Sequence, residues 1–310
     1  MKILVTGGAG FIGSHVADAY IELGHEVVIV DNLSMGNMNN VNPRARFYKM
    51  NIQDPEIFDL FATEKFDVVN HHAAQMDVRL SVANPIFDAT NNIIGTINLL
   101  QAAVKNKVPK FIFISSGGAI YGEQDYFPAD EEHPTRPLSP YGITKLTGEK
   151  YLYFYHHVYG LNYVILRYAN IYGPRQNPKG EAGVIAIFTS KLLTGQQPII
   201  NGEGTQTRDY VYVGDVVAAN VKALNFQGND YFNIGTGVET TVNELFRRLN
   251  HLINAQAQEV HGPAQPGEQL RSVLNHAKAQ RLLNWSPKVS LDQGLLKTIE
   301  FFKQYHQQPS

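Results

Sequence analysis

The decapeptide TGGAGFIGSH, residues 6–15, contains glycines at positions 7, 10 and 13. It follows the apolar run KILV, residues 2–5, and leads into a segment with helical periodicity that begins at Ile12. Glycines at this spacing permit a tight turn and let backbone N–H groups approach a pyrophosphate at a helix N-terminus. The strand–turn–helix context therefore predicts a dinucleotide-binding unit.

An acidic residue stands where such a unit needs one. Asp31 ends the next apolar run, Glu26–Val30, about 20 residues beyond the glycine turn. A carboxylate at this place can accept hydrogen bonds from the adenosine ribose hydroxyls, and it repels a 2′-phosphate. The sequence therefore favours NAD over NADP, against the alternative of an ordinary glycine turn with a solvated aspartate.

Short β-branched, apolar runs alternate with helical patterns in the first half of the chain. Strands are predicted at Lys2–Thr6, Glu26–Val30, Phe66–Asn70, Lys110–Ser115 and Tyr163–Arg167. Helices are predicted at Ile12–Leu23, Asn91–Lys105 and Tyr141–Tyr159. This alternation is typical of an α/β fold with a doubly wound parallel sheet (Rossmann), which binds ligands at the carboxyl ends of its strands.

The alternation of apolar runs and helical patterns ends after about residue 170, and this change predicts a second, smaller lobe. Loops are expected at Pro174–Gly183 and Ala264–Arg271, and helices at Val184–Thr194 and Val242–Leu252. We expect residues 1–170 to form the dinucleotide-binding domain, with part of 205–235 returning to it. Residues 171–310 are expected to form mainly the C-terminal substrate lobe.

Composition excludes several classes of protein. The 310 residues carry a net charge of −2 and contain no cysteine, so nothing points to a nucleic-acid partner, a disulfide or a thiolate metal site. No apolar run reaches the roughly 18 residues of a membrane span. The apolar run at the start of the sequence is too short for the hydrophobic region of a secretory signal. A cytoplasmic protein without a metal is expected, because neither histidine pair, at 71–72 and 156–157, has the spacing of metal ligands.

Tyr141 and Lys145 lie four residues apart at the start of a helical pattern, and therefore on one helix face. An ammonium close to a phenol favours the phenolate and lowers its pKa, which would make Tyr141 a general base near neutral pH. The alternative is a surface lysine that covers a packed tyrosine. The pair therefore indicates a catalytic site only if the rest of the sequence points to a fold that uses it.

That context is a resemblance to the extended short-chain dehydrogenase/reductase family, and within it to the NAD-dependent nucleotide-sugar epimerases and dehydratases. The resemblance runs nearly from end to end. Its motifs are TGGAGFIGSH, VDNLS, HHAAQ, NNIIGT, SSGGAIYG, SPYGITK, LRYANIYGPRQ, TRDYVYVGD and LLNWSPKVSLDQGL. It implies a Rossmann domain with a nucleotide-sugar lobe, Tyr141 as catalytic base, and Lys145 bonded to the nicotinamide ribose.

The resemblance also implies two sets of ligand-binding residues and a partner. Cofactor contacts are expected from Gly7, Gly10, Phe11, Ile12, Gly13, Asp31, Asn32, Ser34, Gly36, Asn51, Ile52, Ala73, Ala74, Gln75, Asn92, Ser115, Tyr141, Lys145 and Tyr168. Substrate contacts are expected from Gly117, Asn170, Val184, Arg208, Arg271 and Ser272. The family pairs its tyrosine helix with the Asn91–Lys105 helix of a second subunit, so a homodimer is expected.

The residues before Tyr121–Gly122 indicate the reaction. Relatives that eliminate water or decarboxylate carry a carboxylate there, whereas this chain has Gly117, Gly118 and Ala119. The resemblance therefore implies 4-epimerisation of a UDP-hexose, UDP-glucose or UDP-galactose, through a 4-keto intermediate. An epimerase of UDP-glucuronate or another nucleotide sugar, and a non-catalytic NAD-binding sensor, remain alternatives.

Gly117 departs from the family, which usually has a serine or threonine at this position to bridge the tyrosine and the sugar 4-oxygen. Ser116, a water molecule or Tyr141 itself could take this role, and Ser116 is our third catalytic candidate. Both glycines, Gly117 and Gly118, are expected to make room for the hexose ring.

The second lobe carries two arginines expected near the diphosphate. Arg208 in TRDY matches the phosphate-binding arginine of the family, and a guanidinium fork suits a diphosphate. Gln265 stands where the family often has another arginine before Pro-Gly, so Arg271 could take over that contact. Ser272 matches the residue that gates the substituent at C2, and its small size predicts that N-acetylated sugars are accepted.

Overall fold

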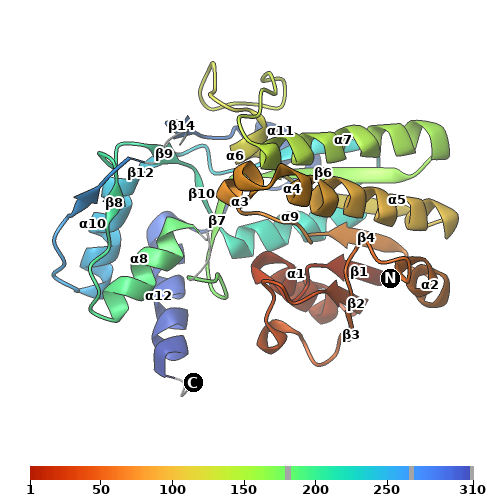
Figure 1. Ribbon diagram of the computed structural model, residues 1–310, viewed down its shortest axis with the longest axis horizontal. Coiled ribbons are helices and arrows are strands. Elements are labelled where there is room, and N and C mark those ends of the chain that lie inside the picture. Colours follow the sequence, from red (N-terminus) through yellow and green to blue (C-terminus); the bar gives the residue numbers. More distant parts are fainter. Residues whose placement is uncertain (179–182, 265–268, 308–310) are drawn as a thin grey trace.

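A parallel seven-stranded sheet forms the centre of the computed structural model, which describes residues 1–178, 183–264 and 269–307 (Figure 1). Its order is β11-β6-β5-β4-β1-β2-β3. The strands are β1 Lys2–Thr6, β2 Glu26–Asp31, β3 Arg46–Lys49, β4 Val68–His71, β5 Lys110–Ser116, β6 Asn162–Tyr168 and β11 Asp230–Ile234. The strand order reverses between β1 and β4, and a doubly wound sheet binds its ligands at this switch point.

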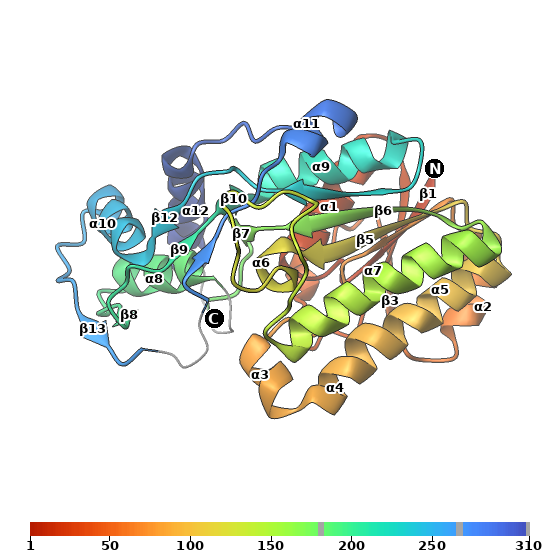
Figure 2. The same ribbon diagram turned by 90° about the horizontal axis from the view of Figure 1, so that it is seen from above.

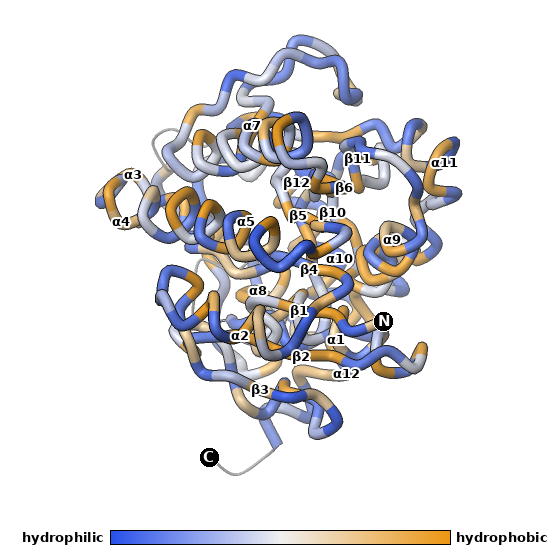
Figure 3. Tube along the Cα trace, turned by 90° about the vertical axis from the view of Figure 1, so that its right-hand side faces the viewer, coloured by the Kyte–Doolittle hydropathy of each residue, from blue (hydrophilic) through white to orange (hydrophobic). Residues whose placement is uncertain are grey.

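Helices cover both faces of the sheet (Figure 2). One face carries α1 Phe11–Glu22, α9 Val213–Asn225 and α11 Ala277–Leu283, and the other carries α2 Ile57–Glu64, α5 Gly95–Lys105 and α7 Pro140–Tyr159. Val5 packs into the first core and Leu4 into the second, so the strands are hydrophobic on both sides. In Figure 3 the hydrophobic stretches accordingly lie along the strands between the two helical layers.

The predicted helix Asn91–Lys105 belongs to a longer helical stretch. It starts with α4 Pro85–Ala89, passes through a π-helical turn η2 Thr90–Ile94, and continues as α5. Pro85 occupies the first turn of α4, where the Asn84 side chain accepts a hydrogen bond from the Phe87 amide at 3.1 Å. A π-turn inside a helix is frequently found at a functional site.

The C-terminal lobe has its own hydrophobic core, which contains Phe188, Leu245, Phe246 and Ile299. Its helices are α8 Val184–Leu193, α10 Val242–Ile253 and α12 Leu291–Gln307. Its short strands are β7 Asn170–Tyr172, β8 Ile200–Asn201, β9 Thr207–Arg208, β10 Tyr210–Tyr212, β12 Thr240–Thr241, β13 His261–Gly262 and β14 Arg271–Ser272. The chain crosses between the lobes several times, because α9, β11 and α11 lie at the large sheet.

Three short helices complete the fold: a 3₁₀ turn η1 Met38–Asn40, α3 Val78–Ala83, and α6 Gly117–Ile120 directly after β5. Within the described ranges, no helix combines the length and hydrophobicity needed to cross a membrane.

Candidate active site

The glycine turn forms a cradle at the carboxyl end of β1. Gly7 has a φ of +70°, and a β-carbon there would lie 2.7 Å from the Ala73 amide nitrogen, so a side chain cannot be accommodated. Gly10 is the N-cap of α1 and has no side chain to cap the helix. The amides of Phe11, Ile12 and Gly13 in the first turn are therefore in position for an anion, and this arrangement fits the pyrophosphate of NAD.

Asp31 is held beside this turn at the end of β2. Its Oδ2 accepts a hydrogen bond from the Ala9 amide at 3.0 Å, and its Oδ1 accepts one from the Leu33 amide at 2.8 Å. A β-carbon on Gly36 would lie 2.7 Å from Oδ1, so only glycine fits against the carboxylate. The sequence-predicted residues Asp31 and Gly36 thus lie together next to the glycine turn.

The loop after β2 meets the end of β3. Asn32 donates a hydrogen bond from Nδ2 to Oδ1 of Asn51 at 3.0 Å, and its own Oδ1 accepts from the Ser34 amide at 2.9 Å. Ile52 differs from its neighbours, because its side chain is buried in the core and its carbonyl accepts from Asn98 at 2.8 Å. Asn32, Ser34 and Asn51 thus form one hydrogen-bonded group, while Ile52 packs into the core.

Ala73, Ala74 and Gln75 follow β4, and Ala73 lies against Gly7 of the glycine turn across the switch point. The Ala73 amide donates to Oγ1 of Thr6 at 3.2 Å, which ties the two strand ends together. The Gln75 amide donates to Oδ1 of Asn92 at 2.8 Å, so the π-turn is fixed to the same segment.

Tyr141 and Lys145 lie on the first turns of α7. This helix begins at Pro140, where the Ser139 hydroxyl accepts a hydrogen bond from the Gly142 amide at 3.1 Å. Lys145 is buried, and its Nζ donates to the Ile114 carbonyl at 2.9 Å and lies 5.8 Å from the centre of the Tyr141 ring. Burial lowers the pKa of Lys145 to about 8, and the charge of Asp88 opposes this fall.

The Ser116 hydroxyl lies close to the phenol of Tyr141. Burial raises the pKa of this phenol to about 12, and the neighbouring Ser116 hydroxyl opposes the rise. The expected lowering of the phenol pKa by Lys145 is therefore not found, because burial dominates and the ammonium lies beside the ring. Ser116, Tyr141 and Lys145 nevertheless form one contiguous group at the end of β5.

The two glycines after Ser116 serve different purposes. A β-carbon on Gly117 would overlap the Leu274 side chain, so this glycine makes room for Leu274 and not for a sugar ring. The expectation for Gly117 is thus corrected. A β-carbon on Gly118 would lie 3.7 Å from Oδ1 of Asn170, 3.9 Å from Oγ of Ser116 and 4.0 Å from Oγ of Ser272. Gly118 therefore faces the polar side chains of Ser116, Asn170 and Ser272.

Two predicted cofactor residues point into the protein. Ser115 donates its hydroxyl to Glu149 at 2.6 Å, and Glu149 forms a buried ion pair with Arg167 at 2.6 Å. Tyr168 packs in the core on the α1 and α9 face, where its hydroxyl accepts from Asn220 at 2.6 Å. Neither hydroxyl reaches Tyr141, because both side chains belong to buried hydrogen-bond networks.

The substrate candidates of the second lobe gather around a three-stranded sheet, β12-β9-β14. Ser272 on β14 lies directly opposite Arg208 on β9, and its side chain is buried next to Gly118. Asn170 on β7 also lies next to Gly118, and Val184 is the first residue of α8.

Arg271 is held by other groups. It forms a bidentate ion pair with Glu239, with distances of 2.9 and 2.7 Å, and its guanidinium lies 3.6 Å from the centre of the Phe127 ring. Its role as a second phosphate contact therefore requires it to leave Glu239. Residues 265–267, which bear on the same prediction, lie outside the described residues.

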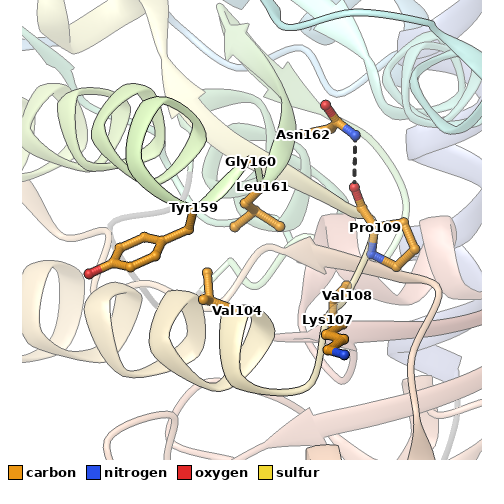
Figure 4. Close-up of a pocket in the computed structure, with 8 residues that line it drawn as sticks. All are labelled: Val104, Lys107, Val108, Pro109, Tyr159, Gly160, Leu161 and Asn162. Carbon is orange, nitrogen blue, oxygen red and sulfur yellow. Dashed lines mark hydrogen bonds between the residues drawn. The ribbon is translucent and has the colours of Figure 1, made fainter.

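A hollow at the opposite end of the sheet is not the site (Figure 4). It lies between the C-terminal ends of α5 and α7, where β5 and β6 begin, and Asn162 donates there to the Pro109 carbonyl at 3.3 Å. Its lining consists of Val104, Lys107, Val108, Pro109, Tyr159, Gly160, Leu161 and Asn162. Across the part of the chain that the structure describes, no group of three His, Asp or Glu side chains could hold a metal ion.

Comparisons with known proteins agree with this geometry. The UDP-glucose 4-epimerase of Thermotoga maritima, solved with UDP-glucose, is 50% identical, with a TM-score of 0.98 over 99% of this chain and 100% of that one. The Thermus thermophilus UDP-glucose 4-epimerase, solved with NAD, is 40% identical, with a TM-score of 0.93 over 98% and 99%. The UDP-glucose 4-epimerase of Mycolicibacterium smegmatis is 43% identical over 98% of this chain and 99% of its own. Residues 3–235 match the sequence model of the NAD dependent epimerase/dehydratase family, and the chain belongs to that family.

Proposed function

We propose that the protein interconverts UDP-galactose and UDP-glucose by NAD-dependent 4-epimerisation. The observation that carries this proposal is the group at the end of β5, in which the Ser116 hydroxyl lies close to the Tyr141 phenol and Lys145 lies one helical turn further on. Solved relatives that bind UDP-glucose and NAD share the whole fold. The interconversion would place the protein in galactose metabolism.

Tyr141 serves as the base that takes the proton of the sugar 4-hydroxyl. Ser116 is placed to bridge the phenol and the 4-oxygen, because its hydroxyl lies close to the phenol of Tyr141. NAD, when bound, would accept the hydride from C4 and return it, and its positively charged nicotinamide would favour the phenolate form of Tyr141. Lys145 holds its ammonium against the Ile114 carbonyl. It would also bond the nicotinamide ribose.

The two lobes divide the binding. The glycine turn, Asp31, and the Gln75–Asn92 pair hold NAD on the large sheet. Asn170, Arg208 and Ser272 hold the UDP-sugar from the smaller lobe. The sugar ring then lies over Gly118, between Ser116 and Ser272.

The site contains no carboxylate at the strand end where dehydratases and decarboxylases need one. Gly117, Gly118 and Ala119 follow Ser116 directly and form the start of α6. A reaction that needs only removal of the 4-hydroxyl proton and transfer of hydride at C4 is therefore favoured over elimination.

The decisive experiment incubates the purified protein with UDP-galactose, without added NAD, and separates the sugars by chromatography. Formation of UDP-glucose, and its absence with Tyr141→Phe, would support the proposal. No turnover of UDP-galactose, with UDP-glucuronate converted on the same column, would replace it with a UDP-glucuronate epimerase. If none of UDP-galactose, UDP-glucuronate and UDP-GlcNAc is converted while NAD stays bound, a non-catalytic NAD-binding sensor would be favoured.

We propose that the protein is a homodimer through α7 and the helical stretch α4–η2–α5. These helices lie side by side on the outer layer (Figure 2), and both carry exposed large apolar residues. They are Ile86, Phe87, Ile94, Ile143, Tyr153, Phe154 and Val158. Sedimentation of the wild type at the mass of two chains, and of Phe154→Glu at the mass of one, would support this arrangement, whereas a monomeric wild type would contradict it.

A further inference from the structure

Asp88 is a buried carboxylate next to the catalytic pair. It lies on α4, and it is 0% exposed. Its Oδ1 accepts hydrogen bonds from Nε2 of Gln75 at 2.9 Å and from Nδ2 of Asn92 at 3.0 Å, and its Oδ2 accepts one from the Thr144 hydroxyl at 3.0 Å. Three donors satisfy a charge that would otherwise be costly to bury.

These three partners come from three separate parts of the site. Gln75 follows β4, Asn92 lies in the π-turn, and Thr144 directly precedes Lys145 on α7. Asn92 is fixed further, because it also exchanges two hydrogen bonds of 2.8 Å with the backbone of Gln75. An acceptor at Asp88 thus determines which way both amide side chains point, since each must present its nitrogen to the carboxylate.

The charge of Asp88 acts on the same residues. It raises the pKa of Lys145, against the larger effect of burial, and it adds to the rise in the pKa of Tyr141. Burial also raises the pKa of Asp88 itself, which the bonds from Thr144 and Gln75 oppose. The ionisable side chains on the surrounding elements are Tyr141 and Lys145 on α7, His71 and His72 at the end of β4, and Asp77 and Arg79 around α3.

We propose that Asp88 is a positioning residue for the epimerisation. One buried carboxylate holds Gln75, Asn92 and the first turns of α7 in register, and its negative charge favours the ammonium form of Lys145. It reaches the reacting atoms only through these neighbours. This inference rests on the function proposed above, and it assigns a role to a residue outside the glycine turn and the tyrosine–lysine pair.

Two substitutions separate the charge from the geometry. Asp88→Asn removes the charge but keeps an oxygen for Gln75 and Asn92, while the Thr144 hydroxyl can accept from the new amide and turn its proton to the Tyr141 carbonyl, 2.9 Å away. Thr144→Val removes one anchor and keeps the charge. Asp292→Asn on α12 is the matched control, because this exposed carboxylate pairs with Arg248 far from the site.

The readout is kcat for UDP-galactose against pH, with bound NAD measured by chromatography after denaturation. For Asp88→Asn we expect both limbs of the profile to move to lower pH, because loss of the negative charge lowers the pKa of both Lys145 and Tyr141. Relative to its own maximum, kcat of Asp88→Asn should therefore be higher than that of the wild type on the acid limb and lower on the alkaline limb. Thr144→Val should lower kcat several-fold without moving the alkaline limb to lower pH.

Each result bears on one claim. A profile of Asp88→Asn that superimposes on the wild type would overturn the role of the charge. Unchanged kcat and unchanged NAD content in Thr144→Val would overturn the positioning role, and this variant decides the matter even where Asp88→Asn does not fold. An inactive wild type would count against the proposed epimerisation instead, so the two failures are distinguishable.

Discussion

A β-carbon on Gly117 would overlap the side chain of Leu274. Gly117→Ser, which supplies the hydroxyl that the family resemblance implies at this position, is therefore expected to strain the core. Overpacking of this kind costs about 1–3 kcal/mol. We expect a lower free energy of unfolding by that amount in urea denaturation, and no rise in kcat.

Gly118→Ser is the matched comparison. Its β-carbon would make only ordinary contacts of 3.7–4.0 Å with Asn170, Ser116 and Ser272. Stability should therefore stay near that of the wild type, while turnover of UDP-galactose falls because the side chain enters the sugar site. A stable, more active Gly117→Ser would contradict this division of roles.

Ser116→Ala tests the serine that lies beside the catalytic phenol. Removal of one preorganised donor from such a site costs on the order of 10²-fold in kcat. We expect that loss with bound NAD retained. Ser115→Ala should instead mainly lower stability, by about 1 kcal/mol, because its hydroxyl bonds the buried Glu149. Equal kcat values for Ser116→Ala and the wild type would show that Tyr141 acts without the serine.

The glycine turn, Asp31 and the tyrosine–lysine pair could be predicted from sequence because each depends on local spacing along a strand or a helix. Ser115 and Gly117 could not, since the direction of a side chain at a strand end depends on what packs there. Glu149 accepts a hydrogen bond from the Ser115 hydroxyl. Leu274, which lies 157 residues further along the chain, fills the space at Gly117.

Asp88 was also hidden from sequence reasoning. Its three partners lie 13, 4 and 56 residues away, and only the folded chain brings them together. The one local signal was the unusual density of polar residues in ATNNIIGT, residues 89–96, within an otherwise apolar helical pattern. Polar residues there fit a buried hydrogen-bond network better than a solvated helix face.

Lys145→Met should stabilise the protein while it abolishes activity. Burial lowers the pKa of Lys145 from 10.5 to about 8. At pH 7 the Lys145 ammonium is therefore less favourable in the folded state than in the unfolded state, and it lowers the free energy of unfolding. Between pH 8 and 10.5 the unfolded state binds more protons, and the stability contribution of Lys145 therefore improves as pH rises.

The free energy of unfolding of Lys145→Met should exceed that of the wild type by about 1–2 kcal/mol at pH 7, once the lost bond to Ile114 is subtracted. The difference should shrink towards pH 10. Urea denaturation of cofactor-stripped protein at both pH values measures it, and a gain that grows with pH would contradict the direction assigned to the lysine pKa.

Ser272 should set the tolerance for a substituent at C2 of the sugar. Its side chain is 1% exposed, and its Oγ lies at the edge of the space over Gly118. We expect the wild type to convert UDP-GlcNAc as well as UDP-glucose, and Ser272→Tyr to lose UDP-GlcNAc turnover by at least tenfold more than UDP-glucose turnover, because a difference of about 1.4 kcal/mol in fit gives that ratio. Chromatography of both reactions supplies the two rates. Ser272→Ala, which keeps the space, should leave their ratio near that of the wild type. A wild type that converts UDP-glucose and leaves UDP-GlcNAc untouched would mean that another residue limits the pocket at C2.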